Sequence, residues 1–234
     1  MADGRWWRVL AGGLVPLAVA GLAGCSGGGG VPPSSLASAD ASGLFSAAQL
    51  SGALLTRVNG VAAAAPATTG RYASLSAAST GRQAIKAGPV SPSACAGAVS
   101  AGFGSAVLAQ APAAAVTFRV GGNAVSEVLT ATSADSASAV LAGRVPGGCA
   151  TYRVKVAGKT VRYGLTDKAV TGIGRQARVL NVHTGGSAPV NQWSLVYRGA
   201  GFVGTVTVVG PNASELAVRE LAQQAYAYAA RALA

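Results

Sequence analysis

Apolar and polar residues alternate along much of the second half of the chain, a pattern typical of half-buried β-strands. In the segment 115–120, Val116, Phe118 and Val120 share one face. A second run follows at 123–132 after two glycines, and paired glycines between two such runs favour a hairpin turn. Similar patterns predict further strands at 71–77, 152–156, 161–165, 176–183, 192–197 and 202–209.

Four segments show the spacing of an amphipathic helix instead. Ser46 and Gln49 have the spacing of a capping box, and the apolar residues that follow predict a first helix over 46–58. In the last helix, we expect Asn212 to be the cap and Leu216 to belong to the buried stripe. The other predicted helices cover 93–102 and 133–144, and the last one extends from 211 to the end of the chain.

The succession of strands joined by short turns favours an antiparallel sheet over parallel crossover units. We therefore predict an α+β fold for residues 43–234. It consists of an antiparallel β-sheet of about five to seven strands packed against helices, with a helix at the C-terminus. A chain of 234 residues is compatible with one such domain that has its own core.

The first 24 residues have the features of a signal peptide. Arg5 and Arg8 precede sixteen uncharged residues, a run too short for a stable transmembrane helix. The run ends in Leu22-Ala23-Gly24-Cys25, which resembles a lipobox, whose cysteine receives a diacylglyceryl group before cleavage. We therefore predict a signal peptide at 1–24 and a lipid on Cys25 that anchors the protein at the extracytoplasmic face of the cell membrane. The alternative is an ordinary secretory signal that a cysteine follows by chance.

Residues 25–42 are rich in Gly, Ser and Pro and have almost no large apolar side chains, so we predict a flexible stalk there. The whole chain has 18 Lys and Arg against 7 Asp and Glu, a net charge of +11. Nucleic acid, anionic lipid headgroups and acidic wall polymers are the partners of basic domains. The predicted export argues against nucleic acid. A basic surface that only keeps the domain soluble is the simplest interpretation.

Two cysteines, Cys95 and Cys149, remain once Cys25 is assigned to the lipid. An even pair in an oxidising compartment predicts a structural disulfide. The sequence has no CxxC spacing and no histidine cluster beside them, so we predict no metal and no other cofactor.

Catalytic motifs are missing from the sequence. It has no GxSxG or SxxK motif, and its single histidine, His183, has no acidic neighbour in sequence. Glu127 and Asp167 are the acidic residues left as catalytic candidates, and we expect Glu127 to be a surface residue of a strand. We therefore predict that the protein is not an enzyme.

Four features of the chain resemble a known family. They are an apolar helix at Leu44–Val58, a Pro-Ser-Ala-Cys95 segment, a second cysteine (Cys149) after the central helix, and a strand–turn–strand–helix ending that starts at Trp193. Together they resemble the extracellular sensor domain of the mycobacterial PknH-type receptor kinases, which also occurs in free-standing actinobacterial lipoproteins. The resemblance implies an antiparallel sheet backed by helices, with a cleft for a ligand. The kinase half and one cysteine pair of that family are missing here.

These observations predict a non-catalytic, sensor-like lipoprotein domain that binds an envelope ligand or a protein partner. A carrier of lipids or glycolipids with a hydrophobic cavity is the alternative. Aromatic and basic residues on the predicted strands are the candidate contacts for an anionic or sugar-like ligand. They are Trp193, Tyr197, Tyr152, Tyr163, Arg153, Arg162 and Arg198.

Overall fold

The computed structural model describes residues 44–77, 89–96, 106–156, 158–185, 189 and 191–234. The chain divides into two compact units between Ala39 and Asp40, and the described residues all belong to the second unit. The predicted signal peptide, Cys25 and the predicted stalk lie outside the described residues. Among the described residues, no helix has both the length and the apolar character needed to cross a membrane.

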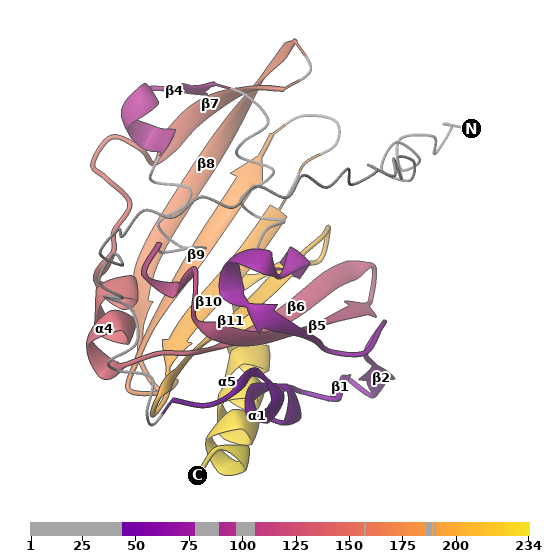
Figure 1. Ribbon diagram of the computed structural model, residues 1–234. Helices are drawn as coiled ribbons and strands as arrows, with labels where there is room; N and C mark the ends of the chain where they lie inside the picture. The colour runs from indigo at the N-terminus through magenta and orange to yellow at the C-terminus, as the bar shows by residue number, and fades with distance from the viewer. Residues whose placement is uncertain (1–43, 78–88, 97–105, 157, 186–188, 190) are drawn as a thin grey trace, which may run out of the picture. The chain divides into compact units, whose positions relative to one another are not determined.

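Nine strands of the described residues form one antiparallel sheet (Figure 1). The sheet is wider than the predicted five to seven strands because a short strand is added at each edge. In spatial order, the strands are β3 (Thr68–Arg71), β5 (Pro112–Val120), β6 (Asn123–Ala131), β11 (Phe202–Val209), β10 (Asn191–Arg198), β9 (Gln176–Thr184), β8 (Lys159–Val170), β7 (Thr151–Val156) and β4 (Val90–Ser91).

Helices pack on both faces of this sheet, so the predicted α+β class is confirmed (Figure 1). Helix α1 (Ala47–Gly52) packs on β5 and β6, and α5 (Glu215–Ala232) packs on β10 and β11. We call the face that they cover the α5 face. The opposite side is the α4 face, because α4 (Ala134–Ala142) packs there on β9, β10 and β11.

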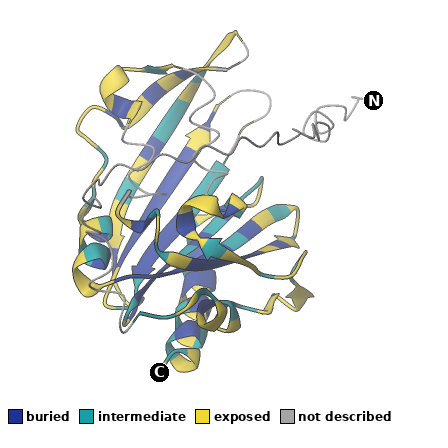
Figure 2. Ribbon diagram, in the orientation of Figure 1, coloured by how far each residue is buried: buried dark blue, intermediate teal, exposed yellow. Residues whose placement is uncertain are grey.

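The main core lies between the sheet and α5. Strand side chains that alternate in sequence, such as Leu195 and Val206, meet a stripe of small and apolar residues on the helix. Small side chains let the helix approach the sheet closely. The buried residues of α5 are Val218, Leu221, Ala222, Ala225 and Ala229. Figure 2 shows that burial is greatest in the central strands and that exposure increases toward β7.

Two details of the predicted C-terminal helix are wrong. Ser214, not Asn212, is the N-cap, and its side chain accepts a hydrogen bond from the backbone N–H of Ala217. The helix therefore begins at Glu215, and its buried stripe contains Leu221, Ala225 and Ala229 but not Leu216. Leu216 is 67% exposed as a result.

The predicted first helix is too long. It ends at Gly52, and Arg57–Val58 form β1 of a two-stranded ribbon with β2 (Val61–Ala62). The turn between these strands has positive φ at both Asn59 (49°) and Gly60 (80°), the geometry that an Asn-Gly turn adopts readily. This local turn preference and a long-range contact of Leu55 outweigh the helical spacing of the leucines.

Two other predicted elements also differ. The segment 71–77 is not a strand: β3 ends at Arg71, and a 3₁₀ turn, η1 (Tyr72–Ser74), follows. In the segment 93–102, the described part is the 3₁₀ turn η2 (Ser93–Cys95), and residues 97–102 lie outside the described residues.

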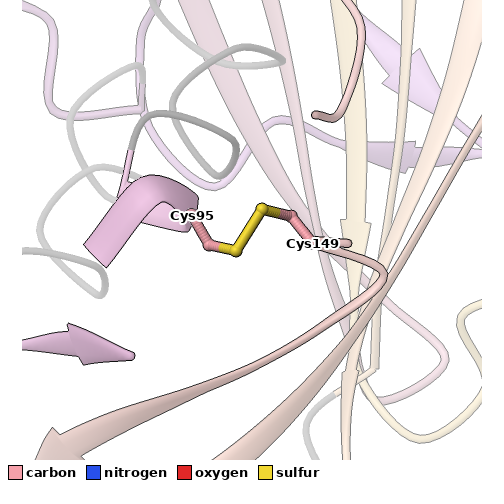
Figure 3. Close-up of a disulfide and its surroundings, with 2 residues drawn as sticks. All are labelled: Cys95 and Cys149. Carbon is pink, nitrogen blue, oxygen red and sulfur yellow. A yellow bond between two sulfur atoms is a disulfide. The ribbon is translucent and has the colours of Figure 1, made fainter. Parts of the chain in front are cut away.

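The predicted disulfide between Cys95 and Cys149 is confirmed (Figure 3). It joins η2 to the segment before β7, and both cysteines are buried on the α4 face in a small cluster with Tyr152, Val154 and Leu165. The bond therefore fixes η2 to the edge of the sheet, beyond the strands β9, β10 and β11 on which α4 packs.

Candidate functional site

The aromatic and basic residues predicted as ligand contacts do not gather at one place. Tyr152 and Tyr163 lie opposite each other on β7 and β8, and their rings stack with centroids 5.2 Å apart. Tyr152 belongs to the disulfide cluster and is buried, and Tyr163 packs against that cluster. Burial, with a smaller contribution from Tyr163, raises the pKa of Tyr152 to about 12. This pair therefore packs the edge of the sheet on the α4 face.

Trp193 and Tyr197 lie on the other side of the sheet. Tyr197 is fully buried beneath α5, and its ring makes edge contacts with Phe202 and Tyr226. Trp193 is half-buried at the border of the same core. Tyr197 is thus inaccessible to a ligand in this structure.

The three predicted arginines are also divided between the two faces. Arg198 points to the α4 face, where its Nη1 donates to Oγ of Ser138 at 2.6 Å and so ties β10 to α4. Arg153 and Arg162 are exposed and lie opposite each other on β7 and β8. Their side chains share the α5 face, because residues directly opposite in a ladder point to the same side. One small ligand therefore cannot contact all seven predicted residues.

A groove on the α4 face offers a better site, and the sequence analysis missed it. Its volume is about 320 Å³, and it lies over β5, β6, β11 and β10. Four hydroxyl side chains cross these strands in one row, because Thr117 pairs with Ser126, Ser126 with Thr207, and Thr207 with Ser194. With neighbouring strands about 4.8 Å apart, the row is roughly 14 Å long.

At the β10 end of the row, two hydroxyl groups bond to each other, whereas the hydroxyl groups at the β5 end have no such partner among the described residues. Ser194 is fully buried, and its Oγ lies 2.9 Å from Oγ1 of Thr207. No hydrogen bond among the described residues uses the hydroxyl group of Thr117, Ser126 or Thr205. These three side chains line the groove and are exposed or half-buried, so their donors and acceptors are turned toward solvent.

Apolar and amide groups complete the lining. Tyr72, Val128 and Val209 supply apolar surface, and Gln192 supplies an amide. Among the lining residues that the structure describes, Arg119 alone carries a charge. A groove of this kind can hold a neutral ligand that has both hydrogen-bonding groups and apolar surface.

The two acidic residues that the sequence left as catalytic candidates are both structural. Asp167 lies on the α4 face, and its Oδ1 accepts from Nε of the buried Arg178 at 2.9 Å. Its Oδ2 also accepts from the backbone N–H of Val145 at 3.2 Å. The ion pair therefore links β8 to β9, and the hydrogen bond from Val145 ties the segment after α4 to the sheet.

Glu127 is not the surface residue that we expected. It is 1% exposed, on the α5 face of β6, between strands that are themselves covered by α1 and α5. Its Oε2 accepts from the backbone N–H of Leu55 at 2.9 Å, whereas its Oε1 has no partner among the described residues. Burial raises the pKa of Glu127 to about 7, although the Leu55 hydrogen bond opposes the shift.

His183 lies near the end of β9, as expected from the sequence. Its Nδ1 is 2.9 Å from Oδ1 of Asn181, and its ring lies over Gly164 of β8, where a Cβ would overlap the imidazole. Within the described part of the chain, no three His, Cys, Asp or Glu side chains gather where they could hold a metal ion.

Comparisons with known proteins find a similarity in structure but none in sequence. No protein-family model matches the chain, and no curated protein matches it in sequence. Among solved structures, it is similar to the extracellular domain of PknH from Mycobacterium tuberculosis, with a TM-score of 0.39 and 15% sequence identity over 71% of this chain and 77% of that chain. A similarity at this TM-score and identity carries no conclusion about function or ligands.

Proposed function

We propose that this chain is a non-catalytic binding lipoprotein of the cell envelope, and that it holds a neutral, hydroxylated ligand such as a glycan in the groove of the α4 face. The observation that carries the proposal is the group of accessible hydroxyls of Thr117, Ser126, Thr205 and Thr207 on three neighbouring strands, β5, β6 and β11. Hydroxyl groups both donate and accept, so they suit a ligand whose own groups are hydroxyls.

The rigidity of the site supports a binding role. The four strands under the groove are central in the sheet and are held from behind by α1 and α5. Side chains on such a scaffold are ordered before the ligand arrives, so little conformational entropy is lost on binding. The location outside the cytoplasm agrees with the disulfide and with the predicted lipid on Cys25.

A carrier of whole lipids is less well supported. The groove has a volume of about 320 Å³, near the lower limit of small-molecule sites, which are about 300–1,000 Å³. It is crossed by polar side chains, whereas acyl chains need a continuous apolar lining. Mass spectrometry of organic extracts from the purified protein tests this alternative, and stoichiometric lipid would favour it.

The experiment that tests the proposal is a calorimetric titration with neutral disaccharides, cellobiose and maltose, of the chain from Ser26 onward. This fragment keeps the second compact unit intact. A triple variant removes the open hydroxyls: Thr117→Val, Ser126→Ala and Thr205→Val. The matched control makes similar changes at exposed positions of the other face: Thr151→Val, Thr160→Val and Thr166→Val.

Each lost hydrogen bond weakens binding by about 0.5–1.5 kcal/mol, so the groove variant should bind the sugar at least tenfold more weakly than the parent. The control should bind as the parent does. Equal affinity of parent and groove variant would contradict the site. If neither sugar gives a heat of binding at millimolar concentrations, the result would contradict this ligand class.

A further inference from the structure

A second surface, on the opposite side of the sheet, is strongly basic. We define the basic surface as Arg153 and Lys155 of β7 and Arg162 of β8. Arg153 lies directly opposite Arg162, and Lys155 lies two residues further along the same face. All three side chains are exposed. Like charges opposite each other in a ladder destabilise it, so this arrangement costs folding energy.

No acidic side chain in the described part of the chain balances these charges. The ion pairs found there join Lys168 and Arg219 to Glu215, and Arg178 to Asp167. None of them uses a residue of the basic surface. Glu127 is buried in the core. The remaining described carboxylates, Asp135 and Glu220, belong to α4 and α5.

The surroundings of the basic surface are open to solvent and contain several hydrogen-bonding side chains. Helix α5 packs mainly on β10 and β11, and it leaves the three side chains of the basic surface exposed. Thr151, Thr160 and His183 flank the arginines and line a shallow depression with Arg162. The hydrogen bond to Asn181 holds the His183 ring on this face. The basic surface is therefore exposed and positive, with hydrogen-bonding groups beside it and with Val161 and Tyr163 as the apolar residues of the depression.

We propose that the basic surface docks the domain on the anionic phospholipid headgroups of the membrane that carries the protein. Charge complementarity is the first argument, because three cations that have no acidic partner among the described residues lie together on an exposed sheet face and match a surface of phosphates. The second is the chain before residue 44. If the predicted stalk of 18 residues (25–42) behaves as a flexible chain, its root-mean-square length is roughly 20–25 Å, which would keep a lipid-anchored domain next to that surface.

Docking through this surface leaves the groove accessible. The basic surface lies on the α5 face and the hydroxyl groove on the α4 face, so contact with the headgroups does not cover the ligand site. The proposal does not depend on which ligand the groove holds, or on whether it holds one.

The test measures binding of the unacylated chain from Ser26 onward to vesicles of phosphatidylcholine with 30 mol% phosphatidylglycerol, by flotation at low salt. The docking variant is Arg153→Gln, Lys155→Gln and Arg162→Gln. The charge-matched control removes three exposed arginines elsewhere: Arg57→Gln, Arg175→Gln and Arg231→Gln.

At about 1 kcal/mol for each basic residue near an anionic surface, the docking variant should bind roughly a hundredfold more weakly than the parent. The control should stay within about threefold of the parent, and parent binding should fall steeply as salt is raised. Equal losses in the two variants would show attraction by net charge alone and overturn the proposal. So would failure of the parent to bind these vesicles, or stronger binding to polyglutamate than to them.

Discussion

The buried carboxyl group of Glu127 should make the stability of the domain depend on pH. The side chain is 1% exposed and receives one hydrogen bond, from the Leu55 amide, and its Oε1 has no partner among the described residues. The hydroxyl of Tyr197 is also buried without a partner. Burial and then the Glu127 charge raise the pKa of Tyr197 well above its usual value, so this phenol stays protonated.

The direction of the pH dependence follows from the pKa of Glu127 in the folded and in the unfolded protein. Its pKa is about 7 in the folded protein and 4.5 in the unfolded chain. Below pH 4.5 both states are protonated, and the contribution to stability is fully present. Between pH 4.5 and 7 only the unfolded chain ionises, so the free energy of unfolding falls by about 1.4 kcal/mol per pH unit. The total loss is about 3 kcal/mol, and it is complete above pH 7.

Urea unfolding of the parent and of Glu127→Gln from pH 4 to pH 8.5 measures this effect. The glutamine cannot ionise, so the difference between the two free energies of unfolding isolates the carboxyl group. The contributions of groups that titrate in both proteins cancel in this difference. Glu215, whose pKa is lowered by its hydrogen bond to Lys168, is one such group. Between pH 4 and pH 8, the free energy of unfolding of Glu127→Gln should rise by about 3 kcal/mol relative to that of the parent.

The reasoning fails if this difference is constant across the range, because Glu127 would then not be buried as a neutral acid. A difference that changes in the opposite direction would show that the folded protein stabilises the carboxylate. Glu220→Gln, which removes an exposed carboxylate from α5, is the control and should leave the profile nearly parallel to that of the parent.

Two further predictions concern the core and the sheet edge. Replacing Cys95 and Cys149 with alanine opens a loop of 54 residues and should lower the free energy of unfolding by about 4 kcal/mol, and a loss below 1 kcal/mol in urea would contradict a constraining role for the bond. Gly204→Ala should cost about 1–3 kcal/mol in thermal or urea unfolding, because its Cβ would overlap the Tyr197 ring. Gly147→Ala has open space and no positive φ, so it should be nearly neutral, and equal effects of the two alanines would refute the packing argument.

The hairpins were predictable because their signals are local. The turn between β5 and β6 has Gly121 and Gly122 with φ of 57° and 81°, as paired glycines between alternating strands indicate. The strand β9 at Gln176–Thr184 was also predicted within one residue, and the C-terminal helix was found although its cap was misplaced. In each case the pattern of the segment alone contains the information.

The remaining features depend on contacts between distant segments. Glu127 is buried because α1 and α5 cover the centre of the sheet, so the prediction of a surface residue was wrong; its two-residue spacing from Val125 and Leu129 was a signal that could have indicated burial. Helix α1 ends early partly because the Leu55 amide bonds to Glu127, 72 residues away in sequence.

The groove could not be predicted from single segments. Thr117, Ser126 and Thr207 come from three strands, and only the strand order β5-β6-β11 aligns them in one row. In the same way, the alternation alone does not show that Arg153 faces Arg162, because the register of β7 and β8 decides it. The predicted aromatic contacts were chosen by residue type, whereas their faces are set by the register.

The most direct test of the binding site is an amide NMR titration of the chain from Ser26 onward with cellobiose and maltose. Binding in the groove predicts shifts that saturate and that are concentrated on β5, β6, β11 and β10, at Thr117, Ser126 and Thr207. Shifts that instead map to the exposed ladder of β7 and β8, or spectra that stay unchanged at millimolar sugar, would contradict the account.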